Sequence, residues 1–259
     1  MVGRPAVTGE LDVARRLLSE AEGVAVLSGA GLSAESGVPT FRGEGGLWRS
    51  YRAEDLATPQ AFRRDPVLVW EWYAWRRGLV GACRPNAAHR SLARLALERP
   101  VAIVTQNVDG LHAVAATEEA GEGDPTPALP LELHGNLFRD RCSRCGARAP
   151  ALPDVEPSTA DSLPRCSVCD GLLRPDVVWF GESLDPSVLQ EAFGRASQAD
   201  VCLVVGTSAL VHPAASVPLS TLRAGGSLVE VNLERTPLSP HAAATLLGPA
   251  GEILPRLLG

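Results

Sequence analysis

Short apolar runs alternate along this chain with stretches in which apolar residues recur every three or four positions. Residues 24–27, 101–104 and 200–205 are almost wholly apolar, which is typical of strands covered on both faces of a sheet. Residues 131–133 and 227–231 are further strand-like runs, each interrupted by one glutamate. Because strands that alternate with helices favour a parallel arrangement, the pattern predicts an α/β chain with a doubly wound parallel sheet.

The intervening stretches predict helices. Residues 8–22 place Leu and Ala side chains on one face, and Thr8 is the expected N-cap. A final helix is expected at about residues 252–258. Three more helices are predicted to begin at Thr58-Pro59, at Pro66 and at Asn86. Residues 113–130 lack apolar periodicity, and we interpret them, above all the acidic part 117–130, as a mobile loop.

Composition narrows the class of protein. The chain has 259 residues, enough for one large domain or one domain with a smaller insert, and 45% of them are hydrophobic. The net charge of −6 argues against a nucleic-acid surface. No apolar run approaches the ~18 residues that would span a membrane, and the first residues lack the apolar core of a signal peptide. We therefore expect a cytoplasmic protein without a membrane partner.

A glycine-rich turn directly follows the first apolar run. Gly29-x-Gly31-x-x-Ala34 fits the dinucleotide-binding pattern that opens a helix after a strand. Such glycines permit a tight turn and a close approach to a pyrophosphate, which the free N–H groups of the helix start would face. The alternative is a glycine turn without a ligand. If the turn does bind a dinucleotide, the sheet is Rossmann-like.

Polar or small residues also follow the other strands. Asn107 and Asp109 lie one residue apart in the turn after residues 101–104, where they could reach a ribose hydroxyl and a carboxamide. The alternative there is an Asx turn that merely precedes a helix. Two further turns follow the runs at residues 200–205 and 227–231, namely Gly206-Thr207-Ser208 and Asn232-Leu233-Glu234. Because ligands bind at the carboxyl ends of parallel strands, these turns are candidates for one site.

Four cysteines have the spacing of a metal site. Cys142 and Cys145 form one C-x-x-C pair, and Cys166 and Cys169 form a second pair after twenty residues. Two such pairs suit one tetrahedral Zn²⁺ ion, and four thiolates leave no open position, so the metal is expected to be structural. Disulfides are the alternative, which the absence of a secretion signal disfavours.

Tyr73 and Arg76 belong to an unusually aromatic stretch that begins at Trp70. Being three apart, they share one face of the expected helix. An aromatic stripe in the core explains part of this pattern. A phenol beside a guanidinium in an apolar setting is also a receptor for a carboxylate, because Arg can form a bidentate charge-assisted pair and Tyr adds a donor.

The stretch GAGLSAESGVPTFRG, residues 29–43, resembles the nucleotide-binding signature of the sirtuins, the NAD-dependent protein-lysine deacylases. TQNVD at 105–109, His134 between Leu133 and Gly135, the four cysteines, and GTS at 206–208 match the family in the same order. The resemblance covers nearly the whole chain. It implies a single catalytic unit, residues 1–259, with a large Rossmann-like domain and a small inserted module. The large domain comprises residues 1–41, 84–135 and 176–259, and the module comprises 42–83 (helical) and 136–175 (zinc ribbon).

The resemblance also implies the roles of individual residues. His134 is the catalytic base, with Asn107 and Asp109 around the nicotinamide and ribose. NAD is expected to contact Gly29, Ala30, Gly31, Ser33, Ala34, Glu35, Thr40, Phe41, Arg42, Trp48, Gln106, Asn107, Val108, Asp109, Gly206, Thr207, Ser208, Asn232, Leu233, Glu234 and Ala250. Backbone of the segment with Val177, Trp179 and Phe180 would pair with an acyl-lysine protein or peptide substrate. His112 is the other candidate for the base, although we expect it to hold the Asp109 loop.

The family reaction implied is acyl removal with consumption of NAD. The acyl oxygen of a modified lysine attacks the ribose carbon, nicotinamide leaves, and free lysine and O-acyl-ADP-ribose are formed. The Tyr73–Arg76 spacing resembles the Tyr-x-x-Arg pair of the subgroup that removes succinyl and malonyl groups. Glu44 departs from the small residue expected there and complicates this preference. The alternatives are a deacetylase only, a protein ADP-ribosyltransferase, an NAD-dependent oxidoreductase or a nucleic-acid-binding zinc ribbon. The oligomeric state stays open, a monomer being one option.

Overall fold

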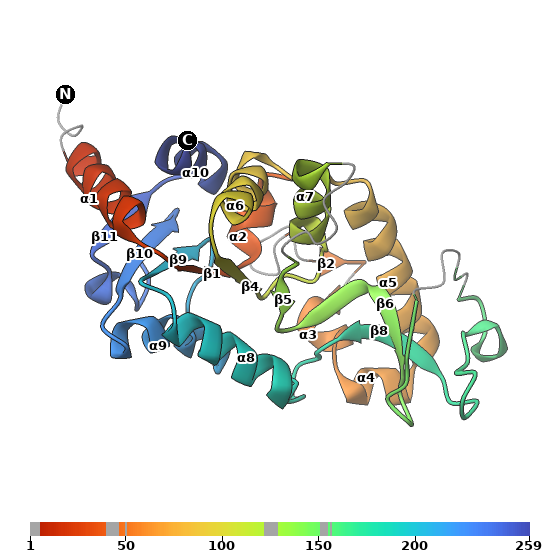
Figure 1. Ribbon diagram of the computed structural model, residues 1–259. Coiled ribbons are helices and arrows are strands. Elements are labelled where there is room, and N and C mark those ends of the chain that lie inside the picture. The colour runs from red at the N-terminus through yellow and green to blue at the C-terminus, as the bar shows by residue number, and fades with distance from the viewer. Residues whose placement is uncertain (1–5, 40–46, 50, 122–128, 151–154, 156) are drawn as a thin grey trace.

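The computed structural model describes residues 6–39, 47–49, 51–121, 129–150, 155 and 157–259. A six-stranded parallel sheet lies at the centre of its larger part (Figure 1). The strand order is β11-β10-β9-β1-β4-β5. The strands are β1 (Val24–Ser28), β4 (Val101–Thr105), β5 (Leu131–Glu132), β9 (Val201–Val205), β10 (Ser227–Asn232) and β11 (Ala244–Leu247). The predicted doubly wound parallel sheet is therefore confirmed.

The strand order reverses at β1, which has β4 on one side and β9 on the other. In register, Val24 lies opposite Val101 of β4 and Val201 of β9. Ligands of open α/β sheets bind at the carboxyl ends of the strands where the strand order reverses in this way. The topology thus places the turns after β1, β4 and β9 at one edge.

Helices cover both faces of the sheet. Helices α1 (Ala6–Glu20), α6 (Ala87–Glu98) and α10 (Ala250–Leu258) share one core with the sheet, in which Leu18, Leu92 and Leu254 pack with Val26. Helix α8 (Pro186–Ser197) packs in a separate core, where Ala192 and Ala196 meet Leu27 and Val204. In Figure 1, α8 and the short α9 (Pro218–Arg223) lie below the sheet, and α1, α6 and α10 lie above it. Two 3₁₀ turns, η3 (Ala214–Ser216) and η4 (Ser239–His241), connect the later elements.

Two predictions about helix boundaries are wrong. Helix α1 begins at Ala6, so Thr8 lies within the helix and is not its N-cap. Helix α7 (Leu111–Ala120) includes the first residues of the stretch interpreted as a loop. Glu119 on α7 accepts from Arg94 on α6 at 2.7 Å, and an ion pair with Arg90 adds to this contact. The acidic residues at the end of α7 are therefore paired with arginines of the neighbouring helix.

The smaller part of the molecule combines two distant segments of the chain. The first holds β2 (Leu47–Trp48), β3 (Tyr51–Arg52), α3 (Ala53–Leu56), α4 (Pro59–Arg64) and α5 (Pro66–Gly81). The second holds β6 (Gly135–Cys142), β7 (Arg148–Pro150), η2 (Ala160–Ser162) and β8 (Leu173–Val177), whose strands form an antiparallel sheet in the order β7-β6-β8. Both segments contribute to one core that contains Trp70, Tyr73, Leu137 and Trp179.

The helix starts in the first segment follow the sequence signals. Thr58 accepts from Ala61 N at the start of α4, and Asp65 accepts from Leu68 N at the start of α5, each with proline as the first helical residue. Asn86 likewise caps α6. None of the helices in the described part of the chain is long and apolar enough to span a membrane.

Candidate functional site

The turns after β1 and β9 pack directly against each other. The Gly31 N–H donates to the Gly206 carbonyl at 2.8 Å. A Cβ on Gly29 would lie 2.7 Å from Thr207 Cβ, and a Cβ on Gly206 would lie 2.3 Å from Leu32 N. Gly206 also has a φ of +59°, which favours glycine. The glycine pattern is thus required by the contact between two turns.

This contact corrects part of the sequence interpretation. Helix α2 (Ala30–Ala34) has only five residues. Its Gly31 N–H is bonded to Gly206, and the Leu32 N–H donates to the Gly29 carbonyl at 3.0 Å. These two groups are therefore not free to face a phosphate, contrary to the expectation for the start of a longer helix.

The turn after β4 is bonded to both of these turns. Asn107 Nδ2 donates to the Gly29 carbonyl and to Ser33 Oγ, each at 3.0 Å. Gln106 Nε2 donates to Thr207 Oγ1 at 2.8 Å. The three strand ends that the sequence pointed to are therefore one hydrogen-bonded unit.

His134 follows β5 and is linked to the same unit. Its Nδ1 lies 2.9 Å from the Gln106 carbonyl oxygen. Because a carbonyl oxygen only accepts, Nδ1 must carry the ring proton, which leaves the Nε2 lone pair available. Burial lowers the pKa of His134 below its ordinary value, although the bond to Gln106 acts in the opposite direction. The imidazole is accordingly neutral at neutral pH and suited to accept a proton.

Asp109 lies in the same turn and is buried. Its Oδ1 accepts from the Leu111 N–H at 2.9 Å, at the start of α7. Burial raises the pKa of Asp109, and the charge of Arg76 acts against this rise. Val108, between Asn107 and Asp109, accepts from Leu137 N at 2.8 Å and so ties the turn to β6.

Two buried histidines lie beneath these turns. His112 Nε2 is 2.8 Å from Ser28 Oγ at the end of β1. Its hydrogen bond is therefore to the first strand, whereas the sequence led us to expect one to the Asp109 loop. His89 Nε2 is 3.4 Å from Ser33 Oγ, and the two rings lie 4.9 Å apart. Burial lowers the pKa of His112 to about 4 and that of His89 to about 2. Both rings are therefore neutral, and sequence reasoning gave no signal for their pairing.

The expected adenosine end is built around Asn232. Its Nδ2 donates to the Thr207 carbonyl at 2.7 Å, and its carbonyl accepts from Gly248 N at 2.9 Å. Leu233 and Glu234 are exposed beyond it. Glu35 accepts from the Gly251 N–H at 2.9 Å and so caps α10, which begins at Ala250.

The remaining expected NAD contacts differ in exposure. Ala34 is exposed, and Ala30 and Ser208 are half-buried. Thr40, Phe41 and Arg42, together with Glu44, lie outside the described residues.

Tyr73 and Arg76 are both buried on α5. The Arg76 guanidinium carbon is 6.0 Å from the Tyr73 ring centroid. Trp179 Nε1 donates to Tyr73 Oη at 2.7 Å. Burial raises the pKa of Tyr73 to about 12, so the phenol keeps its proton at neutral pH. The structure thus brings together a phenol, a guanidinium and the segment that was expected to bind substrate.

The segment from Val177 to Phe180 has fewer free backbone groups than pairing with an added strand would need. The N–H of Val178 donates to the His134 carbonyl, and the N–H of Phe180 donates to the Ala57 carbonyl, each at 2.9 Å. The Trp179 N–H donates to Glu182 Oε2 at 2.9 Å. Val177 is buried in β8, and the Phe180 side chain is 51% exposed. Pairing with a substrate strand stays a prediction, and these three N–H groups are unavailable for it.

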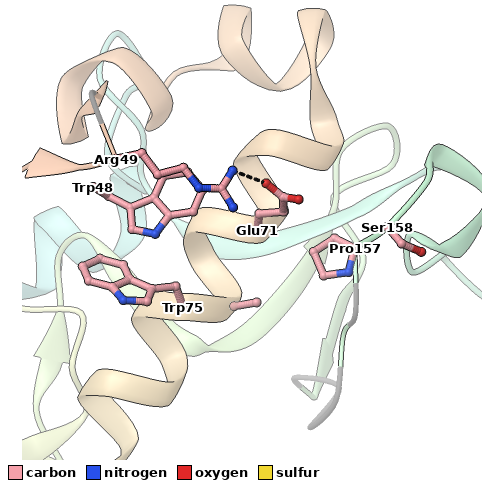
Figure 2. A pocket seen from close by; sticks show the side chains of 7 residues that line it. Trp48, Arg49, Glu71, Trp75, Pro157 and Ser158 are labelled. Carbon is pink, nitrogen blue, oxygen red and sulfur yellow. Dashed lines mark hydrogen bonds and ion pairs between the residues drawn. The ribbon is translucent and has the colours of Figure 1, made fainter.

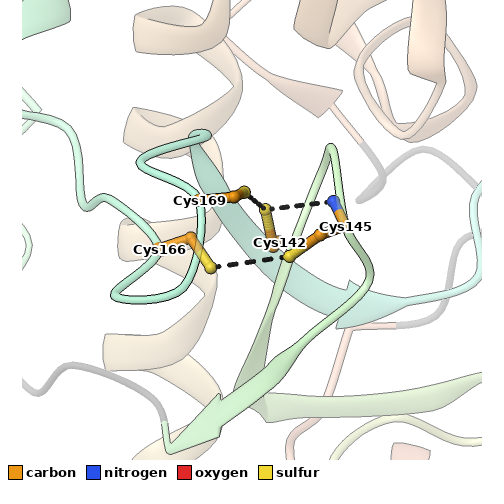
Figure 3. A group of neighbouring side chains, drawn as sticks. All are labelled: Cys142, Cys145, Cys166 and Cys169. Atoms are coloured by element: carbon orange, nitrogen blue, oxygen red, sulfur yellow. Dashed lines mark hydrogen bonds between the residues drawn. The ribbon is translucent and has the colours of Figure 1, made fainter.

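The four cysteines converge as the spacing predicted (Figure 3). Their sulfur atoms all lie within 4.8 Å of one another. Cys142 Sγ is 3.4 Å from Cys169 Sγ, and Cys145 Sγ is 3.7 Å from Cys166 Sγ. These distances are too long for disulfides and close to the roughly 3.8 Å between sulfurs of a tetrahedral zinc–thiolate site. The residues therefore fit one structural Zn²⁺ ion.

A separate pocket of about 450 Å³ lies on the other face of α5 (Figure 2). Glu71 and Trp75, two residues to either side of Tyr73, line it with Trp48 and Arg49. The Arg49 guanidinium lies 4.1 Å from the Trp48 ring centroid and pairs with Glu71 at 2.8 Å. The structure therefore places Trp48, an expected NAD contact, in this pocket and in the core of the smaller part of the molecule.

Comparisons with known proteins agree with this arrangement. Residues 29–213 match the Sir2 family model. A protein of Thermococcus kodakarensis named NAD-dependent protein deacylase is 48% identical over 95% of this chain and 93% of its own. The canine NAD-dependent protein deacylase sirtuin-5, mitochondrial, is 44% identical over 94% of this chain and 83% of its own. A solved complex of a Sir2 homolog with NAD superposes with a TM-score of 0.83, at 42% identity, over 100% of this chain and 94% of that chain.

Proposed function

We propose that this chain, which belongs to the Sir2 family and is an NAD-dependent protein deacylase, acts on more than one acyl group. It removes succinyl and malonyl groups as well as acetyl groups from protein lysine side chains. The observation that carries the proposal is the buried pair of Tyr73 and Arg76. The same spacing is the feature by which the sequence resembles the subgroup that acts on acidic acyl groups. The 44% identity to a protein named sirtuin-5 is consistent with it.

An acidic acyl group would gain more from this pocket than an acetyl group. Arg76 is 8% exposed, and burial lowers its pKa, which means that its charge is poorly solvated. A carboxylate brought to it would form a charge-assisted hydrogen bond, and Tyr73 would donate a second bond. A hydrogen bond to a charged group contributes about 1.5–3 kcal/mol, or roughly 10- to 100-fold in affinity. An acetyl group has no carboxylate to form either bond.

The turns at the sheet edge fit NAD as the co-substrate. NAD supplies the glycosidic bond whose cleavage releases nicotinamide. We assign the nicotinamide end to Asn107 and Asp109, and the adenosine end to Asn232 and its neighbours. His134 Nε2 takes a proton from a ribose hydroxyl, since its Nδ1 is committed to the Gln106 carbonyl.

The zinc site has a structural role in this scheme. Four thiolates complete a tetrahedral set, so the ion has no position for substrate. Two of its ligands lie at and just after the end of β6, and the other two precede β8, which begins four residues after Cys169 and leads to Trp179. Zinc would therefore hold the segment whose Trp179 contacts Tyr73.

A panel of acetyl-, malonyl- and succinyl-lysine peptides with NAD, read by mass spectrometry, tests the proposal. Arg76→Met should lower kcat/KM for the succinyl peptide about 10- to 100-fold relative to the acetyl peptide. Arg63→Met, an exposed arginine on α4, is the matched control and should leave this ratio unchanged. Negligible succinyl and malonyl turnover by the unmodified protein, or equal losses on all peptides in Arg76→Met, would refute the acyl preference.

A further inference from the structure

The Tyr73 hydroxyl has a fixed direction in its hydrogen bond. The indole N–H of Trp179 can only donate, so Tyr73 Oη must accept in the 2.7 Å contact between them. The phenol has one proton of its own, and within the part of the chain that the structure describes no side chain or carbonyl accepts it. The contact with Trp179 therefore leaves Tyr73 as a donor toward another acceptor.

Trp179 is itself held by a buried arginine. The Arg174 guanidinium carbon lies 3.7 Å from the Trp179 ring centroid, and both side chains are 3% exposed. A buried cation stacked on an indole face is strongly attracted to it. The cation also draws electron density from the ring, which strengthens the N–H as a donor.

Glu182 ties this stack to the backbone. Its Oε2 accepts from Arg174 Nη2 at 2.8 Å and from the Trp179 N–H at 2.9 Å. The Glu182 N–H in turn donates to the Trp179 carbonyl at 2.9 Å. One carboxylate oxygen thus fixes both the guanidinium over the ring and the backbone that carries the ring. These contacts hold the indole in the orientation that directs its N–H at Tyr73.

We infer that Trp179 is a positioning residue for acyl specificity: its indole N–H, held by Arg174 and Glu182, orients the Tyr73 hydroxyl so that its proton is directed at the carboxylate of an acidic acyl group. This inference rests on the proposed function. It assigns the Trp179 side chain a role through Tyr73, whereas the sequence interpretation assigned this segment only backbone contacts with substrate. The high pKa of Tyr73 is consistent with a phenol that donates.

A double-mutant cycle separates this role from a merely structural one. Trp179→Phe keeps a ring for Arg174 to stack on and removes the N–H. We expect the ratio of kcat/KM for succinyl to that for acetyl peptide to fall about tenfold, mainly through a higher KM for the succinyl peptide. In a Tyr73→Phe background, which has no hydroxyl to orient, the same change should alter the ratio by less than about twofold.

Controls keep each outcome decisive. Trp75→Phe, on the opposite face of α5, is the matched exchange and should leave the ratio unchanged. If Trp179→Phe does not fold, as judged by thermal unfolding, β-(3-benzothienyl)alanine at position 179 keeps the shape of the indole with sulfur in place of N–H, and the same loss is expected. If either change at 179 leaves the ratio unaltered, or lowers it equally with and without the Tyr73 hydroxyl, the positioning role is overturned while the proposed function stands. If Tyr73→Phe alone leaves the ratio unaltered, the proposed acyl pocket itself fails.

Discussion

The two buried histidines beneath the strand-end turns make the protein sensitive to mild acid. His112 contacts Ser28, and His89 contacts Ser33, so both neutral rings support the residues that hold the turn after β1. The perturbation is a fall from about pH 7.5 to about pH 5. The comparison variant is His112→Gln, which removes one titrating ring and keeps an amide that can reach Ser28.

The magnitude follows from the pKa values. An unfolded histidine titrates near 6.5, and burial lowers the pKa of His112 to about 4. The unfolded state therefore binds more protons below pH 6.5, and stability is lost as the pH falls from there toward 4. At pH 5 the loss is about 1.5 units times about 1.4 kcal/mol, or about 2 kcal/mol. His89, whose pKa is lowered to about 2, adds a similar loss.

Urea unfolding followed by circular dichroism at a series of pH values measures this effect. The free energy of unfolding of the unmodified protein should fall about 2 kcal/mol more between pH 7.5 and pH 5 than that of His112→Gln. Acid release of zinc affects both proteins alike and cancels in the comparison. His241→Gln, with an exposed ring, controls for the exchange itself. Equal losses in His112→Gln and in the unmodified protein would refute the reasoning.

Three further predictions concern the site and its support. His134→Ala should abolish turnover with the thermal midpoint little changed, and an active, folded variant would contradict the assignment. In the unmodified protein, the acid limb of the pH profile of kcat should lie below about pH 6.5, since burial lowers the pKa of His134. The protein should contain one zinc per chain by atomic absorption, and chelation or Cys142→Ser should lower the free energy of unfolding by several kcal/mol; a stable, metal-free protein would disprove the site. Gly206→Ala should lower the free energy of unfolding in urea by about 3–5 kcal/mol, because the new Cβ meets Leu32 N. Gly225 also has positive φ but faces open space, so Gly225→Ala should lower it by only about 1–2 kcal/mol. Equal losses in the two variants would show that the turns do not interlock.

The central strands could be predicted because both of their faces are covered. At residues 24–27, 101–104 and 201–205 every position must be apolar, so the pattern is continuous. β11 (Ala244–Leu247) gave no such signal, since its run begins with Ala and Thr. Helix α8, whose buried residues are the small Ala192 and Ala196, was missed for a similar reason. The size of the apolar residues and the continuity of their runs, more than the topology, therefore decided which strands and helices could be predicted from the sequence.

Long-range partners explain the other differences. The end of α7 is rich in Glu, and these residues pair with Arg90 and Arg94, which lie 25 to 28 residues earlier in the chain, so no local pattern shows the partners. The glycine motif could be located from its spacing, but its contact with Gly206 could not. Likewise the spacing of Tyr73 and Arg76 was visible, whereas the bond from Trp179 depends on how two distant segments meet. The convergence of the four thiols needed no such knowledge, because the two C-x-x-C pairs already predict it.

The core around Trp70 is shared by segments that lie some hundred residues apart, since the Trp70 indole donates to the Leu173 carbonyl and Tyr73 accepts from Trp179. During synthesis on the ribosome the chain emerges from its amino end, so α5 leaves the exit tunnel long before its partners exist. Trp70 and Tyr73 then lack these partners until translation has passed Trp179. Nascent chains that pause within this interval should therefore be the ones that engage chaperones.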